Sequence, residues 1–594
     1  MTTTLTTPSG STVRDLNKNG RLDIYEDPSQ PVDARVDDLL SQMTLAEKAG
    51  LLFQTMAPLG AWRVLPSGEE LITTKLMNFF NVIGVAPVRE MAEWYNALQK
   101  VAEESRLGIP VTVSTDPRHM FSDNLGANFN AGEFSHWPEP LGFAATRDSA
   151  LVEQFADIAR QEYVAVGIRA ALHPVADVAT EPRWARINGT FGEDAELVGD
   201  LVAAYIRGFQ GSELGPTSVS CMTKHFPGGG PQKDGEDPHF PYGREQVYPG
   251  DNFDYHLGPF EKAFEAGTAQ IMPYYGMPVG IGCEEVGFGF NKGIITGLLR
   301  DHYGFDGIVC SDWGLVSDAN IMGKFLPARA WGVEHLSEIE RVKKILDAGC
   351  DQFGGEACPH HVIELVESGQ ILESRIDESA RRLLREKFIL GLFDNPYVDV
   401  EAAVALVGND EFTAAGSLAQ RRSIVLLKND VDLLPIRNRP KVYVEGIDPE
   451  ALANDADVVP TVEEADLAIL RIAAPFEPRD ELGLEALFHA GSLAFSDEER
   501  DRILAITNAV PTIVDIYLDR PAVIPEIAAS CAALTANFGA EASAIVDVLF
   551  GRFTPEGKLP FEMPSSMDAV RAQKSDVPYD SAAPLFPFGH GLSW

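Results

Sequence analysis

The chain has 594 residues, of which 48 are basic and 88 acidic, so its formal net charge is −40. A surface of this charge repels nucleic acid and anionic membranes, and we expect neither as a partner. No apolar run approaches the roughly 20 residues of a membrane-spanning helix. The start shows no basic end and no apolar stretch, which favours a cytoplasmic location unless a secretion signal has been trimmed. The length predicts at least two domains.

Residues 15–26, DLNKNGRLDIYE, have the spacing of an EF-hand calcium loop, with oxygen-bearing side chains at alternate positions and Gly20 at the sharp turn. The alternative is a polar turn, because the loop stands alone and no good helix precedes it. We predict a structural calcium site in an N-terminal segment, residues 1–30, and no cofactor for catalysis. The predicted metal positions are Asp15, Asn17, Asn19, Arg21, Asp23 and Glu26.

From Val32 to about Leu392, amphipathic helices alternate with short apolar runs. Thr44 and Glu47 form a capping box that predicts the start of a second helix. Alternating strands and helices predict a parallel sheet, and the length favours a (β/α)8 barrel of the triosephosphate isomerase type over residues 31–395. The predicted strands are 109–114, 170–176, 219–223, 269–272, 307–310 and 351–354.

Polar and aromatic side chains follow these predicted strands. Because the carboxyl ends of barrel strands meet at one face, the clusters predict one shared pocket. A solvated loop or a helix cap would explain any single cluster, but five clusters in register favour the pocket. The clusters are Asp116, Arg118 and His119; Arg183, Trp184, Arg186, Asn188, Glu193 and Asp194; Lys224 and His225; Tyr274 and Tyr275; and Asp312 and Trp313.

Acidic, basic and aromatic side chains without metal-ligand spacing suit a neutral, polyhydroxylated substrate such as a sugar. The run FPGGG at 226–230 lacks the spacing of a phosphate-binding loop. Two other classes fit the same residues: a barrel isomerase or aldolase with Lys224 as Schiff base, and a sugar-binding protein without catalysis.

Several motifs extend over nearly the whole chain: EPRWAR at 181–186, TFGED at 190–194, KHF at 224–226, SDW at 311–313, SIVLLKNDVDLLP at 423–435 and FPFGHGLSW at 586–594. In number and order they resemble glycoside hydrolase family 3, which includes many β-glucosidases and exo-glucanases. The resemblance implies an N-terminal barrel followed by an α/β sandwich domain. We expect a linker over residues 396–410 and the sandwich over 411–594, with strands at 441–444, 467–472 and 512–517 and helices at 497–508 and 542–549.

The resemblance also implies a retaining, exo-acting β-glycosidase, most simply a β-glucosidase with a carbohydrate substrate. Asp312 would be the nucleophile, and Lys224 or a nearby Arg is expected to lower its pKa. By motif match, Asp116, Arg183, Lys224 and His225 would bind the terminal sugar, with Tyr275 and Trp313 beside the nucleophile. Glucoside, xyloside and N-acetylglucosaminide stay open as substrates, and the sequence is compatible with a homodimer.

Two places in the chain compete for the general acid/base. The glucosidase branch takes a Glu from the second domain, and Glu477 is the first candidate, ahead of Glu481 and Glu485. The N-acetylglucosaminidase branch uses an Asp-x-His pair after KHF, and Asp237 and His239 stand there. The layout favours Glu477 and leaves His239 as the alternative.

Overall fold

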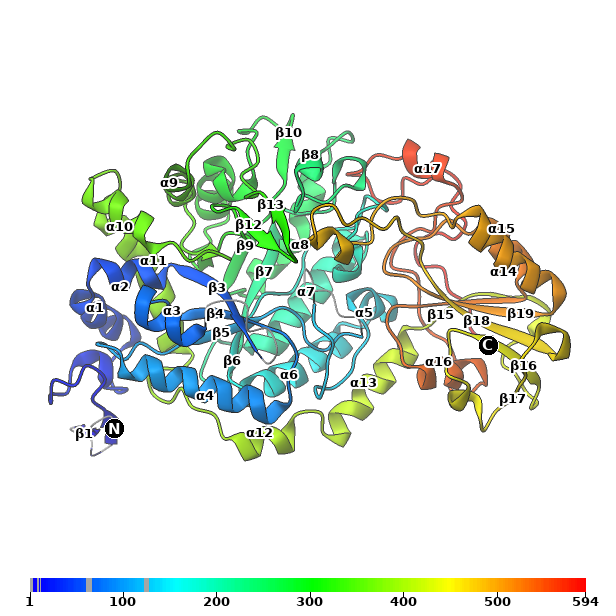
Figure 1. The fold of residues 1–594 in the computed structure, drawn as a ribbon, viewed down its shortest axis with the longest axis horizontal. Helices are drawn as coiled ribbons and strands as arrows, with labels where there is room; N and C mark the ends of the chain where they lie inside the picture. Colours follow the sequence, from blue (N-terminus) through cyan, green and yellow to red (C-terminus); the bar gives the residue numbers. More distant parts are fainter. Residues whose placement is uncertain (1–3, 8–9, 11, 60–66, 122–127) are drawn as a thin grey trace.

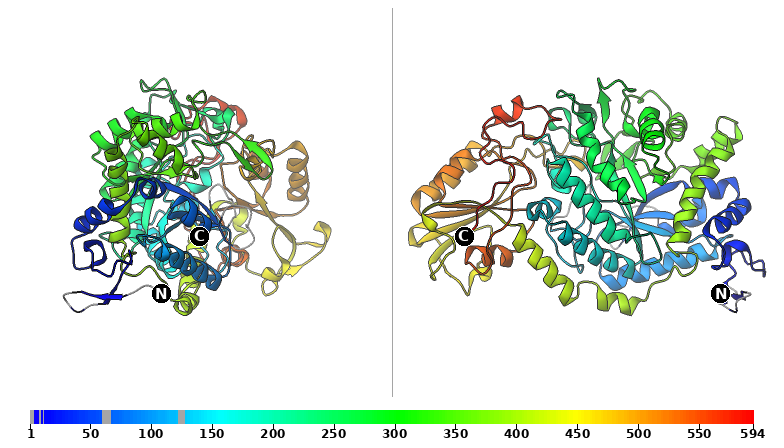
Figure 2. Two further views of the ribbon diagram at one scale, coloured as in Figure 1. Left: turned by 60° about the vertical axis from the view of Figure 1, so that its left-hand side comes forward. Right: turned by 180° about the vertical axis from the view of Figure 1, so that it is seen from behind.

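The computed structural model describes residues 4–7, 10, 12–59, 67–121 and 128–594. It has two domains side by side along the longest axis of the molecule (Figure 1). The N-terminal end lies at the outer side of the first domain, and the C-terminal residue lies on the second (Figure 2). Within the described residues, no helix combines the length and hydropathy of a membrane span.

The first domain is built on an eight-stranded parallel sheet in the order β11-β9-β7-β6-β5-β4-β3-β14. Residues 310 and 352 form a parallel bridge between the two end strands, so the sheet closes into a barrel. The predicted barrel is confirmed. Its strands are β3 (Phe53–Pro58), β4 (Phe79–Ile83), β5 (Thr112–Thr115), β6 (Ile168–Ala171), β7 (Ser220–Phe226), β9 (Gln270–Pro273), β11 (Ile308–Val309) and β14 (Phe353–Gly354).

Helices surround this barrel, and several start where the sequence signals predict. Thr44 and Glu47 form the predicted capping box at the start of α2. The helices up to the end of the domain are α1 (Val32–Gln42), α2 (Leu45–Leu51), α3 (Gly68–Lys75), α4 (Val88–Glu104), α5 (Pro140–Thr146), α6 (Ser149–Ala165), α7 (Ala195–Gln210), α8 (Phe253–Glu265), α9 (Glu338–Ala348), α10 (Pro359–Glu367) and α11 (Glu373–Ile389).

Short strands outside the barrel shape its two ends. At the N-terminal end, β1 (Thr4–Thr6) pairs with β2 (Thr12–Arg14). Above the barrel, β8 (Glu245–Val247) pairs with β10 (Met277–Val279), and β12 (Ala319–Ile321) forms a hairpin with β13 (Lys324–Leu326). The segment Gly293–His302 is π-helical.

Two helices, α12 (Val400–Leu406) and α13 (Asp410–Ser423), run along one side of the molecule from the barrel to the second domain (Figure 1). The second domain has a six-stranded sheet in the order β15-β20-β19-β18-β16-β17, in which only β15 is antiparallel to its neighbour. Its strands are β15 (Val425–Asn429), β16 (Lys441–Glu445), β17 (Asp457–Val458), β18 (Leu467–Ala473), β19 (Thr512–Tyr517) and β20 (Ala533–Asn537).

Helices α14 (Asp497–Ala509) and α15 (Pro525–Ser530) lie on one side of this sheet and α16 (Ala542–Leu549) on the other, which is the predicted α/β sandwich (Figure 1). The last helix, α17 (Met567–Ala572), belongs to a segment that returns to the barrel. The terminal motif then joins the sheet, because the Leu592 amide donates to the Leu426 carbonyl at 2.7 Å.

Candidate active site

Asp312 lies three residues beyond the end of β11, at the C-terminal end of this barrel strand. Its carboxylate is buried, with 5% of the residue exposed. Oδ1 accepts the Trp313 amide at 2.8 Å, whereas Oδ2 has no hydrogen-bond partner among the described residues. The His225 Nε2 atom lies 3.9 Å from Oδ2. Asp312 therefore keeps one carboxylate oxygen free to attack a substrate atom.

Burial raises the pKa of Asp312, and the charges of His239, Arg186 and Lys224 oppose this effect. The sequence predicted a lowered pKa, and that expectation is wrong in its net direction. The cations act as predicted, but removing the carboxylate from water has the larger effect.

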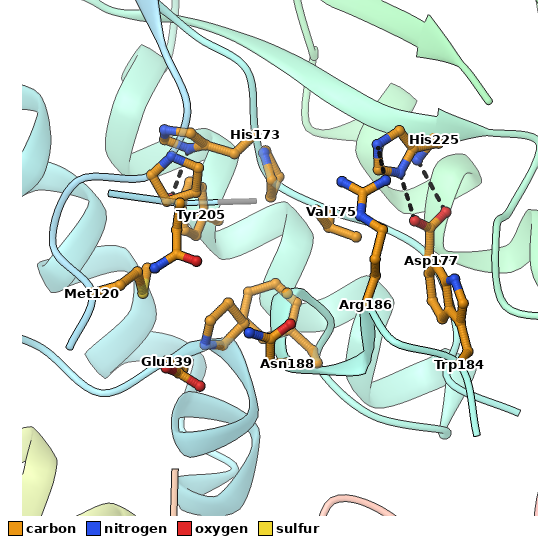
Figure 3. Close-up of a pocket in the computed structure, with 16 residues that line it drawn as sticks. Met120, Glu139, His173, Val175, Asp177, Trp184, Arg186, Asn188, Tyr205 and His225 are labelled. Atoms are coloured by element: carbon orange, nitrogen blue, oxygen red, sulfur yellow. Dashed lines mark hydrogen bonds and ion pairs between the residues drawn. The ribbon is translucent and has the colours of Figure 1, made fainter. Parts of the chain in front are cut away.

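His225 is held in one tautomer by its neighbours. Its Nδ1 lies 2.7 Å from Asp177 Oδ2, and its Nε2 lies 3.2 Å from the Arg186 guanidinium (Figure 3). Because a carboxylate only accepts and a guanidinium only donates, Nδ1 must carry the proton and Nε2 must accept. Burial, followed by the charges of Arg186 and Lys224, lowers the pKa of His225, so the ring is neutral.

Asp116 and Lys224 form a second polar group near Asp312. The Lys224 Nζ atom lies 3.0 Å from Asp116 Oδ1, and Asn81 donates its amide to Asp116 Oδ2 at 3.1 Å. Lys224 lies near the end of β7, immediately before His225, while Asp116 follows β5. Two strands that flank β6 thus present opposite charges, with side-chain exposed fractions of 5% for Lys224 and 15% for Asp116, an arrangement suited to sugar hydroxyl groups.

Tyr275 and Trp313 complete the wall around Asp312. The Tyr275 hydroxyl accepts the Trp313 amide at 3.0 Å, and the Arg329 guanidinium lies over the Tyr275 ring at 5.6 Å. Trp313 is partly exposed and packs over the glycines at 354 and 355. Both predicted aromatic residues therefore stand next to the predicted nucleophile.

The loop after β7 brings a buried histidine to this wall. His239 packs on Tyr275 with ring centroids 4.5 Å apart, and its Nδ1 lies 2.6 Å from Asp237 Oδ1. Asp237 also accepts the Trp184 indole N–H at 2.9 Å. Burial lowers the pKa of His239, while Asp237 opposes that shift. The pKa of Asp237 falls to about 2 because His239 and Arg186 outweigh the effect of its burial.

Arg183 and the acidic candidates of the second domain lie farther out. Among the described residues, Arg183 pairs with Glu181 at 2.8 Å and Asp234 at 3.7 Å, and not with Asp312. Glu477 and Glu481 are exposed. Glu485 is buried, but its two oxygens accept the Tyr242 hydroxyl and the Leu482 amide, both at 2.7 Å. Within the described residues, none of the three glutamates forms a hydrogen bond or ion pair with Asp312.

Three residues that the sequence placed in the pocket instead form hydrogen bonds that hold the fold together. The His119 ring lies 2.7 Å from buried Glu162, and Arg118 donates to the carbonyls of residues 82 and 84. Glu193 accepts the amides of Glu562 and Tyr579 at 2.6 and 3.1 Å, so the TFGED motif binds the C-terminal segment. Burial raises the pKa of Glu193 to about 8.

A cavity lies beside His225, on the side of Asp177 and Arg186 (Figure 3). Asn188, Glu139 and Met120 line its far wall, and Asp312 is not among its lining residues. Glu139 accepts the Tyr517 hydroxyl of the second domain at 2.8 Å. This cavity thus lies beside His225 and Asp177, at a contact between the two domains, and Asp312 does not line it.

The N-terminal loop uses its predicted metal ligands in hydrogen bonds within the chain. Asp15 accepts the amides of Asn19 and Gly20, Glu26 accepts the amide of Asp23, and the Asn19 side-chain amide donates to Asp23. In the part of the chain that the structure describes, no three His, Cys, Asp or Glu side chains are gathered to hold a metal. Calcium is also bound by Asn and backbone carbonyl oxygens, which residues 15–26 carry, so calcium binding by this loop stays a prediction of the sequence.

Asp177, Arg186, Arg329 and Asp237 are central to the site. Arg186 was predicted as a pocket residue without a specific role, and Asp237 was predicted only as part of the alternative acid/base, whereas Asp177 and Arg329 were not predicted from the sequence. In the sequence, each of them is a polar residue within an apolar run or within one of the motifs, and this could have indicated a role in the site. Asp177 stands in HPVADVAT and accepts two backbone amides, those of His225 and Gly229. A buried acid surrounded by apolar residues is a signal for such a role.

Residues 69–386 match the family model of the glycosyl hydrolase family 3 N terminal domain, and residues 443–594 match that of the family's C-terminal domain. Probable beta-glucosidase C of Aspergillus oryzae is 54% identical over 589 residues, covering 97% of this chain and 92% of that protein. The periplasmic beta-glucosidase/beta-xylosidase of Dickeya chrysanthemi is 43% identical over 625 residues, covering 99% and 94%.

Among solved structures, the beta-glucosidase from Listeria innocua in complex with isofagomine has a TM-score of 0.75 and 23% identity, covering 94% of this chain and 83% of that one. This likeness concerns the fold alone. The two family models match one domain each, so the protein is a two-domain glycoside hydrolase. The chain belongs to glycosyl hydrolase family 3.

Proposed function

We propose that the protein is a retaining, exo-acting β-glucosidase that removes terminal non-reducing β-D-glucosyl residues. The observation that carries the proposal is the free Oδ2 of Asp312, buried at the barrel mouth among cationic and aromatic groups. The relatives named beta-glucosidase, which cover nearly the whole chain, support glucose as the sugar.

In the first step, Oδ2 of Asp312 bonds to the anomeric carbon as the bond to the leaving oxygen breaks. In the second, water attacks that carbon and releases the carboxylate, so the β configuration is retained. Lys224 and Arg186 stabilise the ionised carboxylate. The Asp116–Lys224 pair is placed to bind sugar hydroxyls, and charged hydrogen bonds of this kind strengthen as the sugar distorts.

For the acid/base, the geometry supports His239. Its Nδ1 is fixed by Asp237, as in other catalytic His–carboxylate pairs. Its Nε2 forms no hydrogen bond within the described part of the chain and can carry the proton for the leaving oxygen. His239 is also the charge that most favours the ionised form of Asp312. The predicted acid/base Glu477 is exposed, with its amide paired to the Ala490 carbonyl.

Separate variants of Asp312, His239 and Glu477 test these roles. Incubation with a 2-deoxy-2-fluoro-β-glucoside should add one glycosyl unit to Asp312, found by peptide mass, and Asp312→Asn should take up none. His239→Ala should lose mainly the glucosides with poor leaving groups and recover turnover with azide. If Glu477→Ala behaves in this way and His239→Ala does not, the second domain supplies the acid/base.

A second activity, on β-xylosides, has one supporting observation. The 43% identical relative is named for both glucosidase and xylosidase action. A panel of 4-nitrophenyl β-glucoside, β-xyloside and β-N-acetylglucosaminide separates the three predicted specificities. A kcat/KM highest for the N-acetylglucosaminide would contradict the glucosidase proposal.

Calcium binding by the N-terminal loop stays a prediction of the sequence. Thermal unfolding measured with excess calcium and with a chelator tests it, because a ligand that binds only the folded state raises Tm. Equal Tm values in the two conditions would contradict calcium binding. The predicted cytoplasmic location and homodimer are tested by fractionation and by light scattering.

A further inference from the structure

A loop of the second domain, between β18 and α14, contacts the barrel. It comprises residues 475–490, and we call it the domain loop. Its two ends lie side by side, because the Glu477 amide donates to the Ala490 carbonyl at 2.9 Å. Buried Arg520 also fixes both ends, since it donates to the carbonyls of Pro475 at 2.8 Å and of Ala490 at 3.4 Å. The second domain therefore holds the ends of the loop, and the middle is left to contact the barrel.

Arg479, in the middle of the domain loop, forms an ion pair with the barrel. Its two terminal nitrogens donate to the two carboxylate oxygens of Glu236, and the longer bond is 3.0 Å. The guanidinium also lies over the Tyr242 ring, 5.4 Å from its centroid. The two side chains of the pair are 26% and 27% exposed, so solvent screens their attraction only in part.

A second ion pair between the domain loop and the barrel is weaker. Lys324 lies 3.6 Å from the Asp480 carboxylate, and the two side chains are 41% and 86% exposed. Exposed pairs of this kind contribute little to stability. The Arg479–Glu236 pair is therefore the stronger ionic link between the loop and the barrel.

Glu236 stands directly before the pair that contains the candidate acid/base. Asp237 follows it in the chain, and Asp237 Oδ1 accepts the His239 amide at 2.9 Å and lies 2.6 Å from His239 Nδ1. A displacement of Glu236 would therefore displace Asp237, and the His239 ring with it. Because Arg479 holds Glu236 from the second domain, the position of this ring depends on the contact between the domains.

The domain loop also contacts the His239 ring directly. The buried Phe488 ring lies 4.9 Å from the His239 ring, and the Tyr275 ring lies 4.5 Å from it, centroid to centroid. The Tyr275 hydroxyl accepts the amide of Trp313, the residue after Asp312. The loop thus forms part of the wall that holds His239, and a loosened loop would leave the ring less confined.

We propose that Arg479 is a positioning residue, which closes the domain loop on the barrel through Glu236 and so holds the proton donor of the leaving oxygen in place. This inference rests on the proposed β-glucosidase function. For His239, the effect passes through Glu236 to Asp237 and through the loop to Phe488. Glu477, the other candidate acid/base, belongs to the domain loop itself.

Two substrates separate proton donation from the rest of the reaction. Phenyl β-D-glucoside has a poor leaving group that needs a proton, whereas 2,4-dinitrophenyl β-D-glucoside has a good one that leaves almost without it. Arg479→Met removes the charge and keeps much of the side-chain volume. We expect its kcat/KM to fall about 10- to 100-fold on the phenyl substrate and less than about threefold on the dinitrophenyl substrate. A merely structural role would lower both values alike.

A reversed ion pair tests whether the pair itself matters. Glu236→Gln should behave like Arg479→Met, and the double variant Arg479→Glu/Glu236→Arg should recover most of the activity on the phenyl substrate, because opposite charges face each other again. The control is Arg502→Met, which breaks the ion pair of Arg502 with Glu445 inside the second domain, where the side chains are 41% and 28% exposed. It should leave kcat/KM for both substrates unchanged.

The ratio of the two kcat/KM values decides the outcome. A ratio that Arg479→Met leaves unchanged, whether activity is kept or lost equally on both substrates, would overturn the inference while leaving the proposed function intact. A reversed pair as slow as the single variants, or a selective loss in Arg502→Met, would also contradict it. No turnover of either substrate by the native enzyme would refute the proposed function, and the inference with it.

Discussion

Replacing Asp177 with Asn tests whether the fixed tautomer of His225 matters for catalysis. Asp177 Oδ1 accepts the amides of His225 and Gly229 at 3.0 and 2.7 Å, and an Asn oxygen can keep both bonds. The new amide N–H group would replace Oδ2, which lies 2.7 Å from His225 Nδ1. Because that N–H donates, His225 would have to carry its proton on Nε2.

The proton on Nε2 would then face the Arg186 guanidinium, 3.2 Å away. Two opposed buried donors cost about 1–3 kcal/mol. At about 1.4 kcal/mol per tenfold change in rate, Asp177→Asn should lower kcat/KM by roughly 5- to 150-fold. The loss arises because Arg186 and His225 must move away from their positions around Asp312.

The assay is kcat/KM on an aryl β-glucoside, measured across the pH range with thermal unfolding of the same samples. Burial raises the pKa of Asp177 to about 6, so protonation of Asp177 contributes to the acid limb of the native profile. The variant should lack this contribution. Asp515→Asn is the control, because Asp515 is equally buried but lies in the sheet of the second domain, bonded to Thr535. A kcat/KM within twofold of the native value would refute the reasoning.

Three further variants address the contact of Glu193 with the C-terminal segment, the contact between the domains, and the sugar site. The folded-state pKa of Glu193, about 8, lies above its usual value, so its contribution to stability is present at low pH and lost as pH rises towards 8. Glu193→Gln should reduce the difference in unfolding free energy between pH 5 and pH 8 by about 1–3 kcal/mol, measured by urea unfolding. An unchanged difference would count against this role of Glu193. Arg520 is buried and donates to the carbonyls of residues 183 and 475. Arg520→Met should lower the free energy of unfolding by about 2–4 kcal/mol, because it leaves these buried carbonyls without a donor. A loss below ~0.5 kcal/mol would contradict a stabilising role for this contact. Asp116→Asn should lower kcat/KM at least about 100-fold, because Lys224 would lose its charged partner and the sugar would lose a charged hydrogen-bond acceptor. Retention of most activity would exclude a role of Asp116 in binding the sugar.

The sequence predicted the barrel and the sandwich because their periodic patterns are long. Strand β19 and helix α16 have the predicted bounds. The first two barrel strands, Phe53–Pro58 and Phe79–Ile83, were not predicted. These strands carry two buried polar residues, Gln54 and Asn81. Gln54 donates to Ser114 inside the barrel, and Asn81 donates to Asp116 of the site. These polar residues interrupt the apolar pattern expected of a buried strand.

The site was predictable where a motif ends a strand, as at Asp312, Lys224 and His225. It was not predictable where the partner comes from a distant segment. Glu193 was predicted to lie in the pocket because it is polar. Only the folded chain brings the amides of residues 562 and 579 to its carboxylate. The Asp237–His239 pair was identified as an alternative, because sequence spacing cannot tell which candidate acid lies beside the nucleophile.

The C-terminal segment holds the two domains together by non-covalent contacts, in addition to the covalent link between them. Asp576 accepts the amides of Gly250 and Asn252 from the barrel, and Glu193 holds two more amides of the same segment. A protease cut within residues 396–410 would therefore leave two fragments that stay associated through these buried contacts. The same arrangement means that the catalytic face is assembled late during synthesis, since the residues that fasten it are translated after both sheets.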